Sequence, residues 1–150
     1  MKQNLPDFVK FEERYNAVLN NGQRAELRRA AEPSDLAMLP SYYHLIGPKG
    51  RANDSWYRFV YFLPYVRHKD DAPSFGSLLP QNDRIEKRIF HIVRSQYPND
   101  LINLRRLVQQ IKPTVDWRIF GKTLFYWNEV SKKQLIQDYF IVGNKEKTTS

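Results

Sequence analysis

Cysteine is absent from this 150-residue sequence, which excludes disulfide bonds, thiolate nucleophiles and cysteine ligands for zinc or iron–sulfur clusters. A long hydrophobic run is also lacking. The densest apolar stretch, WYRFVYFLPYV at residues 56–66, contains Arg58 and Pro64 and is shorter than the roughly 20 residues that a membrane helix needs. The first residues, MKQNLP, lack the apolar core of a secretory signal. We therefore expect a cytoplasmic protein that makes no membrane contact.

Histidine is scarce: His44, His68 and His91 lie far apart, at none of the spacings typical of zinc enzymes. One of them begins the acidic sequence HKDD at residues 68–71, which offers ligands for a metal-dependent nuclease. Such a site needs its ligands held rigidly at about 2 Å from the ion, and a proline-containing loop with a lysine inside it is unsuited to that. We favour a solvated turn, keep the nuclease as the weaker alternative, and expect no catalytic residue, metal or cofactor.

Acidic residues are outnumbered, with 16 Asp and Glu against 24 Lys and Arg, which gives a formal net charge of +8. Residues 81–150 hold 13 of the basic residues and 7 of the acidic ones, so +6 of the excess lies in the second half. A basic excess of this size is typical of proteins that bind a polyanion such as nucleic acid. An ordinary soluble domain with a basic isoelectric point is the alternative.

Apolar residues recur every three or four positions along most of the chain, which predicts helices. Helices are expected at about residues 6–19, 23–32, 33–39, 41–46, 55–68 with a kink at Pro64, 84–97, 99–112, 116–127 and 131–142. No stretch alternates convincingly as a strand would. We expect an all-α protein of two small helical lobes: residues 1–68, a linker at 69–82, a four-helix bundle at 83–143 and a polar tail at 144–150.

One predicted helix carries four closely spaced aromatic residues, Phe59, Tyr61, Phe62 and Tyr65. Proteins that bind single strands use such residues as a platform on which bases stack. The spacing here is that of a buried helix, and the tryptophans at positions 117 and 127 follow the same pattern. We therefore favour a core role for these aromatic residues over a stacking role.

The helical phase of the basic residues can be calculated at about 100° per residue. If the apolar stripe from Leu101 to Ile111 faces inward, Arg106 points away from the core and Arg105 lies at its flank. The same calculation places Lys122 opposite the core of its own helix, with Arg118 one turn before it. Each of these cations alone fits a solvated helix face equally well.

The helix at residues 84–97 shows the same arrangement. Lys87, His91 and Arg94 lie one turn apart on a shared face, while Arg88 flanks the core. Three successive helices thus offer cations on their outer faces with few acidic residues nearby, which suits contact with a phosphate backbone.

Four motifs occur in order over about residues 8–142: GxRAxLRR followed by EP (Gly22, Arg24, Ala25, Leu27, Arg28, Arg29, Glu32, Pro33), RIFxxxR (Arg88 to Arg94), LRRLV (Leu104 to Val108), and DW with a distal tryptophan (Asp116, Trp117, Trp127). In order and spacing these motifs resemble the CasB small-subunit family of type I-E CRISPR Cascade complexes. There is one departure, because the family's Ser-Leu-Gly-Arg segment is Ser74-Phe75-Gly76-Ser77 here and lacks the arginine.

The resemblance implies an all-helical, non-catalytic subunit, with two copies lying head to tail in an RNA-guided complex. The implied partners are the backbone and large subunits, the guide RNA, and the target DNA including its displaced single strand, all bound without reading sequence. The family is basic at the positions of Arg28, Arg29, Arg88, Arg94, Arg105, Arg106, Lys122 and Lys132.

The candidate nucleic-acid-binding residues are therefore Arg24, Arg28, Arg29, Lys87, Arg88, Arg94, Arg105, Arg106, Arg118, Lys122 and Lys132. A different class of function remains in competition with this interpretation. The chain would then be a helical protein–protein adaptor whose basic face meets an acidic protein, with no direct contact to nucleic acid.

Overall fold

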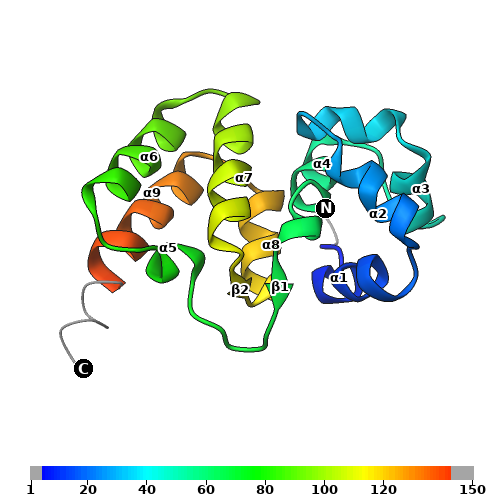
Figure 1. Cartoon of the computed structure of the whole chain (residues 1–150), viewed down its shortest axis with the longest axis horizontal. Helices are drawn as coiled ribbons and strands as arrows, with labels where there is room; N and C mark the ends of the chain where they lie inside the picture. The colour runs from blue at the N-terminus through cyan, green and yellow to red at the C-terminus, as the bar shows by residue number, and fades with distance from the viewer. Residues whose placement is uncertain (1–4, 143–150) are drawn as a thin grey trace.

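Helices make up most of the chain in the computed structural model, which describes residues 5–142 (Figure 1). The amino-terminal part holds α1 (Phe8–Ala17), α2 (Asn21–Arg28), the 3-10 helix η1 (Pro33–Met38), α3 (Pro40–Ile46), α4 (Asp54–Val60) and the 3-10 turn η2 (Leu63–Tyr65). The carboxy-terminal part holds α5 (Phe75–Leu78), α6 (Asp83–Arg94), α7 (Asn99–Ile111), α8 (Trp117–Phe125), α9 (Glu129–Gln137) and the π-helical turn η3 (Asp138–Val142). The expected all-α class is confirmed. The polar tail at 144–150 lies outside the described residues.

Asparagine and aspartate side chains begin most of the α-helices by accepting a backbone N–H of the first turn. In α2 the Asn20 side chain accepts the Gln23 backbone N–H at 2.8 Å, and the Gln23 side chain accepts the Asn20 N–H at 2.9 Å. This reciprocal capping box starts the helix at Asn21, two residues before the predicted start.

Two short strands interrupt the helical pattern. The helix predicted to reach His68 ends earlier, and β1 (Arg67–His68) runs parallel to β2 (Thr114–Val115), with Arg67 opposite Thr114. Backbone N–H groups of Arg67 and Lys69 donate to the oxygens of Pro113 and Val115 at 3.2 and 2.9 Å. Strands of two residues are too short to show the alternation by which a strand is predicted.

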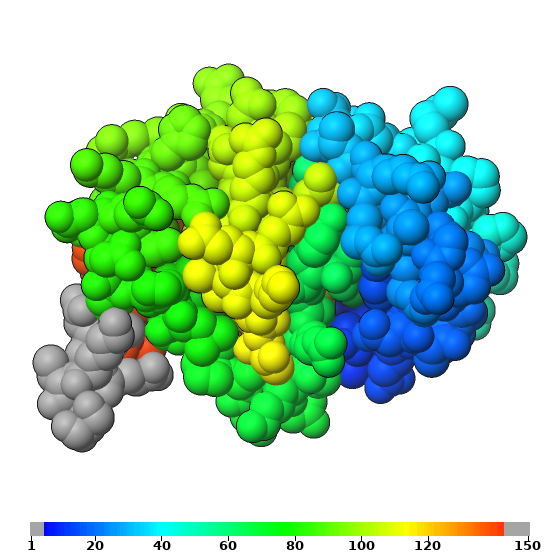
Figure 2. Space-filling model, viewed as in Figure 1, coloured from blue at the N-terminus to red at the C-terminus, as the bar shows by residue number. Residues whose placement is uncertain are grey.

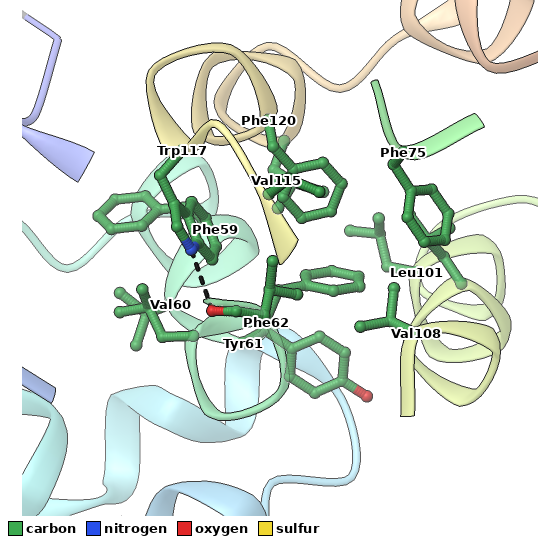
Figure 3. Packing of buried hydrophobic residues seen from close by; sticks show 14 of the residues in the cluster. Phe59, Val60, Tyr61, Phe62, Phe75, Leu101, Val108, Val115, Trp117 and Phe120 are labelled. Carbon is green, nitrogen blue, oxygen red and sulfur yellow. Dashed lines mark hydrogen bonds between the residues drawn. The ribbon is translucent and has the colours of Figure 1, made fainter. Parts of the chain in front are cut away.

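Buried apolar residues from both ends of the chain form one continuous cluster. α8 packs against α4 and α1, whereas α6 packs against α7 and α9. α8 lies close against α1 at Gly121, where an added Cβ would be 2.3 Å from the Phe8 ring. The Trp117 indole N–H donates to the Val66 backbone oxygen at 3.1 Å, and the dashed line that starts at Trp117 in Figure 3 marks this bond. The segment predicted as a linker contains α5, whose Phe75 belongs to the same cluster.

The aromatic residues of the sequence WYRFVYFLPYV lie mainly in this core. Phe59, Tyr61 and Phe62 are at most 1% exposed, as the core interpretation predicted. Tyr65 is half-buried at the edge of the cluster. Among the described residues, no helix combines the length and the apolar character that crossing a bilayer requires.

Candidate nucleic-acid interface

The outward sides of α6 and α7 carry cations around a shared groove. The groove has a volume of about 310 Å³ and is lined by Lys87, Arg88, His91, Ile92, Asn103 and Arg106. Arg88 donates to the side-chain oxygen of Gln110, and Arg106 donates to that of Asn103 at 3.3 Å. Within residues 5–142 no carboxylate pairs with these arginines or with Lys87. The groove therefore keeps its positive charge available.

A second open hollow, of about 640 Å³, lies along α6 and is lined by Glu86, Lys87, Phe90, His91, Arg94 and Ser95. The guanidinium carbon of Arg94 lies 5.1 Å from the centre of the Phe90 ring. Lys87, His91 and Arg94 are all exposed, which confirms the shared outer face calculated from helical phase. Lys87 and His91 border both hollows, so the two hollows adjoin along α6.

The arginines of α2 have different environments. The Arg29 side chain is exposed and makes no hydrogen bond or ion pair within the described part of the chain. Arg28 is also exposed, and its guanidinium donates to the Tyr15 hydroxyl at 3.3 Å. Burial raises the pKa of Tyr15, and the bond from Arg28 partly offsets this rise. Both arginines keep most of their donors free for a partner.

Arg24 instead holds the end of α1. Its guanidinium donates to the backbone oxygens of Leu19 and Asn16, the latter at 3.1 Å, and to the Asn21 side chain at 2.5 Å. The Asn16 carbonyl is one of the unsatisfied acceptors that a helix leaves at its carboxy terminus, and that of Leu19 lies just beyond the helix. Arg24 thus has a structural role that limits its contact with nucleic acid.

Arg105 lies between the two parts of the molecule. Its guanidinium carbon is 3.9 Å from the centre of the Tyr61 ring and 5.6 Å from that of Tyr65. Burial raises the pKa of Tyr61 to about 12, although the charge of Arg105 opposes the rise. One guanidinium nitrogen of Arg105 is buried without a hydrogen-bond partner in the described structure. Arg105 therefore stacks across the junction, whereas its neighbour Arg106 is exposed, as predicted.

The same tyrosines connect the two Leu-Arg-Arg sequences of the chain. Tyr65 donates its hydroxyl to the Arg28 backbone oxygen at 3.4 Å, while Arg105 of α7 covers the rings. Figure 2 shows α7, in yellow, beside the amino-terminal part in blue, with the green segment around β1 recessed between them. We use the term cationic face for the exposed or half-exposed cations of α2, α6 and α7: Arg28, Arg29, Lys87, Arg88, Arg94 and Arg106.

The predicted cations of α8 do not join this face. Arg118 forms a two-pronged ion pair with Asp116, with nitrogen–oxygen distances of 2.6 and 2.9 Å. The pair holds the pKa of Asp116 well below its usual range and raises that of Arg118. Lys122 is exposed and unpaired among the described residues, but α8 lies behind α7 in the view of Figure 1.

Lys132 of α9 is only 8% exposed, although the resemblance implied a nucleic-acid contact. Its ammonium nitrogen lies 3.1 Å from an Asp100 carboxylate oxygen and donates to the Ser95 backbone oxygen at 2.9 Å. The Trp127 indole N–H donates to the same Asp100 oxygen at 2.9 Å. The charge of Lys132 is thus paired with Asp100 inside the protein, and we leave this residue out of the interface.

The acidic sequence HKDD begins in β1, and the fold brings His68 and Asp70 within 4.8 Å of Asp116. These groups already have partners. One His68 ring nitrogen accepts the Trp117 backbone N–H at 3.0 Å, and the other lies 2.6 Å from Asp70. Asp116 in turn accepts the Arg118 guanidinium. The bond between His68 and Trp117 links β1 to the start of α8. The donor atoms of the cluster are satisfied without an ion.

Two uncharged residues that hold the arginines of the groove were not singled out from sequence. Asn103 and Gln110 hold the guanidinium groups of Arg106 and Arg88. Both lie about one helical turn from Arg106, so the helical spacing of α7 already placed them on its outer side. Polar residues without charge give no other signal in a single sequence.

Similarity to known proteins extends over most of the chain. The family model of the CRISPR-associated protein Cse2 matches residues 23–140. The chain is 32% identical over 142 residues to the CRISPR system Cascade subunit CasB of Escherichia coli strain K12, covering 85% of this chain and 89% of that protein. It also matches a chain in the crystal structure of E. coli Cascade bound to a PAM-containing double-stranded DNA target. That match has a TM-score of 0.85 and 31% identity, and covers 95% of this chain and 99% of the other.

Proposed function

Because the chain belongs to the Cse2 family of CRISPR-associated proteins, we propose that it is the non-catalytic small subunit of a type I-E Cascade complex. In this role it binds nucleic-acid backbone without sequence specificity. It stabilises the pairing of guide RNA with target DNA and holds the displaced single strand. Its proposed protein partners are the backbone and large subunits and a second copy of itself.

The cationic face is the observation that supports this function. Its cations come from three helices and have no carboxylate partners among the described residues. Contacts from Lys and Arg to phosphates give affinity and position without reading bases. In an RNA-guided complex that is sufficient, since base pairing with the guide supplies the sequence specificity.

A binding experiment tests the proposal with two single-stranded DNAs of equal length and unrelated sequence. We expect the full chain, or the reconstituted complex if the free chain binds weakly, to have the same affinity for both DNAs. Changing Lys87 and Arg106 together to Ala should weaken binding to both alike. The slope of log K against log salt should flatten by roughly 0.7 for each lost contact.

The matched control is Lys133→Ala, which removes an exposed cation of α9 outside the cationic face. Its affinity and salt slope should equal those of the parent. If the double variant folds normally and binds like the parent, the cationic face does not contact nucleic acid.

A protein–protein adaptor is the second candidate, and exposed apolar residues favour it. Ile119 of α8 is 62% exposed and Val130 of α9 is 72% exposed, on helices that do not form the cationic face. Subunit contacts in an assembly would cover such side chains. The adaptor function is supported if changing Ile119 and Val130 to Ser abolishes complex assembly while changing Lys87 and Arg106 to Ala leaves DNA binding unaltered.

A further inference from the structure

The amino-terminal part of the molecule has a groove that shares no residue with the cationic face. It has a volume of about 600 Å³ and lies between the start of α1 and the segment that joins α3 to α4. The groove is lined by Leu5, Pro6, Asp7, Lys10, Phe11, Arg14, Ile46, Gly47, Pro48, Lys49, Arg51 and Trp56. Its size is within the range of sites that bind small molecules or short peptide segments.

Hydrogen bonds and close packing fix the shape of this groove. The Arg14 guanidinium donates to the backbone oxygens of Leu45 and His44 at 2.8 and 3.1 Å, which ties α1 to the end of α3. The Tyr42 hydroxyl donates to the Arg51 oxygen at 2.6 Å. At Gly50 an added Cβ would lie 2.4 Å from the Ile46 Cβ, so the loop approaches α3 as closely as only glycine allows. The site is therefore preformed.

The floor of the groove is apolar, and its tryptophan ring is almost wholly covered by the protein. Trp56 is 6% exposed, and its ring meets Phe11 edge to face at a centroid distance of 5.3 Å. Ile46 is likewise 6% exposed and supplies aliphatic carbon to the floor. Base stacking needs an open ring face, whereas an apolar side chain needs only the carbon surface that these residues provide.

The rim of the groove is positively charged. Lys10, Lys49 and Arg51 are exposed, and none of them forms an ion pair within residues 5–142. The acidic lining residue, Asp7, accepts the Lys10 backbone N–H at 3.1 Å as the cap of α1. An apolar floor below unpaired cations complements a ligand that has an apolar side chain between carboxylates.

We propose that this groove binds an acidic peptide segment of a protein partner. One apolar side chain of the segment occupies the floor over Ile46 and Trp56. Aspartate or glutamate residues on either side of it meet the cations of the rim. The proposal does not depend on nucleic-acid binding by the cationic face, because the two surfaces share no residue.

Fluorescence anisotropy with the full chain tests the proposal. The probes are short fluorescein-labelled peptides, each with one central Leu, Phe or Trp flanked on both sides by Asp and Glu. We expect at least one to bind, and to bind at least about tenfold more weakly to Lys49→Glu/Arg51→Glu, whose rim charge is reversed. Leu5→Asp, at an exposed edge of the groove, should weaken binding without disturbing the core.

The control variant Lys69→Glu/Lys133→Glu makes the same change of charge at exposed positions outside the groove. It should bind the peptides within about twofold of the parent, because distant surface charges are screened by salt. The proposal is rejected if no peptide binds below about 1 mM, or if the control loses affinity as much as the groove variant. It is also rejected if single-stranded DNA, and not peptide, loses affinity when the rim is reversed.

Discussion

The environment of each cation decides whether its charge faces solvent or serves the fold. Arg105 and Arg106 are neighbours in α7, yet the first stacks on Tyr61 and the second is exposed. Lys132 and Lys133 differ in the same way, since only Lys132 reaches Asp100. Charge counts alone therefore overstate the number of residues available to a polyanion.

Alanine substitutions at neighbouring positions of the second Leu-Arg-Arg sequence should differ in their effects on stability and on DNA binding. Leu104 is 1% exposed, so Leu104→Ala should leave a cavity and cost about 2–5 kcal/mol of folding free energy. Arg106→Ala should cost no more than about 0.5 kcal/mol and should flatten the salt slope of DNA binding by roughly 0.7 to 0.9. Arg105→Ala should lie between them, because it removes a cation–π contact worth about 0.5–2 kcal/mol.

Thermal melts and DNA affinities at several salt concentrations measure these effects. An Arg106→Ala variant that melts early and keeps the parental salt slope would show that Arg106 is a structural residue.

Asp116 should make stability depend on acid pH. The bonds from the Arg118 side chain hold its pKa below the ordinary value, which is about 3.9 in an unfolded chain. The stabilisation is therefore complete above about pH 5 and declines progressively as the pH falls through 4 toward the lower pKa of the folded state. We expect Asp116→Asn to melt below the parent at pH 7, with a difference that shrinks between about pH 5 and pH 3.

Asp71→Asn is the control for this experiment. The Asp71 carboxylate is 95% exposed, so its contact with Arg118 at 3.4 Å is screened by solvent and contributes little. Its backbone N–H, which donates to Asp116, is preserved by the change. Its melting temperature should follow the parent across the same pH range. A constant gap between Asp116→Asn and the parent at every pH would contradict the electrostatic explanation.

The orientation of single cations could be predicted only as far as one helix determines it. The phase of α7 placed Arg106 outside because its own apolar stripe gave the inward direction. Lys132 could not be placed in this way, since its partners Asp100 and Ser95 come from a distant part of the chain. The stacking of Arg105 on Tyr61 could not be predicted either, because the two residues are far apart in the sequence.

At the scale of elements, α9 is attached to the start of α7 by a buried ion pair. Lys132→Ala should leave the Asp100 carboxylate, whose side chain is 3% exposed, without its cation. Removing one partner of a buried pair typically costs about 3–5 kcal/mol. Urea unfolding of this variant should show that loss, whereas Lys133→Ala should unfold like the parent.

Measuring both the stability and the DNA affinity of Lys132→Ala distinguishes a structural role of Lys132 from a role in DNA binding. If Lys132→Ala were as stable as the parent but bound DNA less tightly, the lysine would act at the surface. The expected result is the reverse, with lower stability and an unchanged salt slope for the fraction that remains folded.

Helices with long apolar stripes were predicted well, and short elements were not. α6 and α7 lie where their periodicity placed them, with Ile89 and Val108 fully buried. The helix expected to reach His68 ends instead in η2 and β1, because the backbone there pairs with β2 across the sequence. α5 was missed, since a single turn has too few residues to show a period.

The whole molecule should resist separation after its chain is cut. Residues 69–71 and Pro73 are exposed, whereas Phe75 and Leu79 are buried. Limited proteolysis should therefore cut first within 69–74, the first part of the predicted linker. The two fragments should elute together from a sizing column without denaturant, because α8 packs against α4 and α1.

Fragments that separate under native conditions would show that the two predicted lobes fold and persist independently. Primary cuts inside α6 or α7 would place the boundary elsewhere. A denaturing gel run beside the sizing column distinguishes a nicked, associated protein from an uncut one.

The packing of α8 against the amino-terminal helices also sets the order of events during translation. Arg58 donates to the backbone oxygen of Leu124, which is synthesised 66 residues later. At roughly 5–20 residues per second, the ribosome needs about 3–13 s to make that stretch. Throughout this interval α1 and α4 are on the nascent chain without the helix that covers them. Their apolar sides are then a target for chaperones, and slowing translation between the codons for residues 60 and 125 should prolong that exposure.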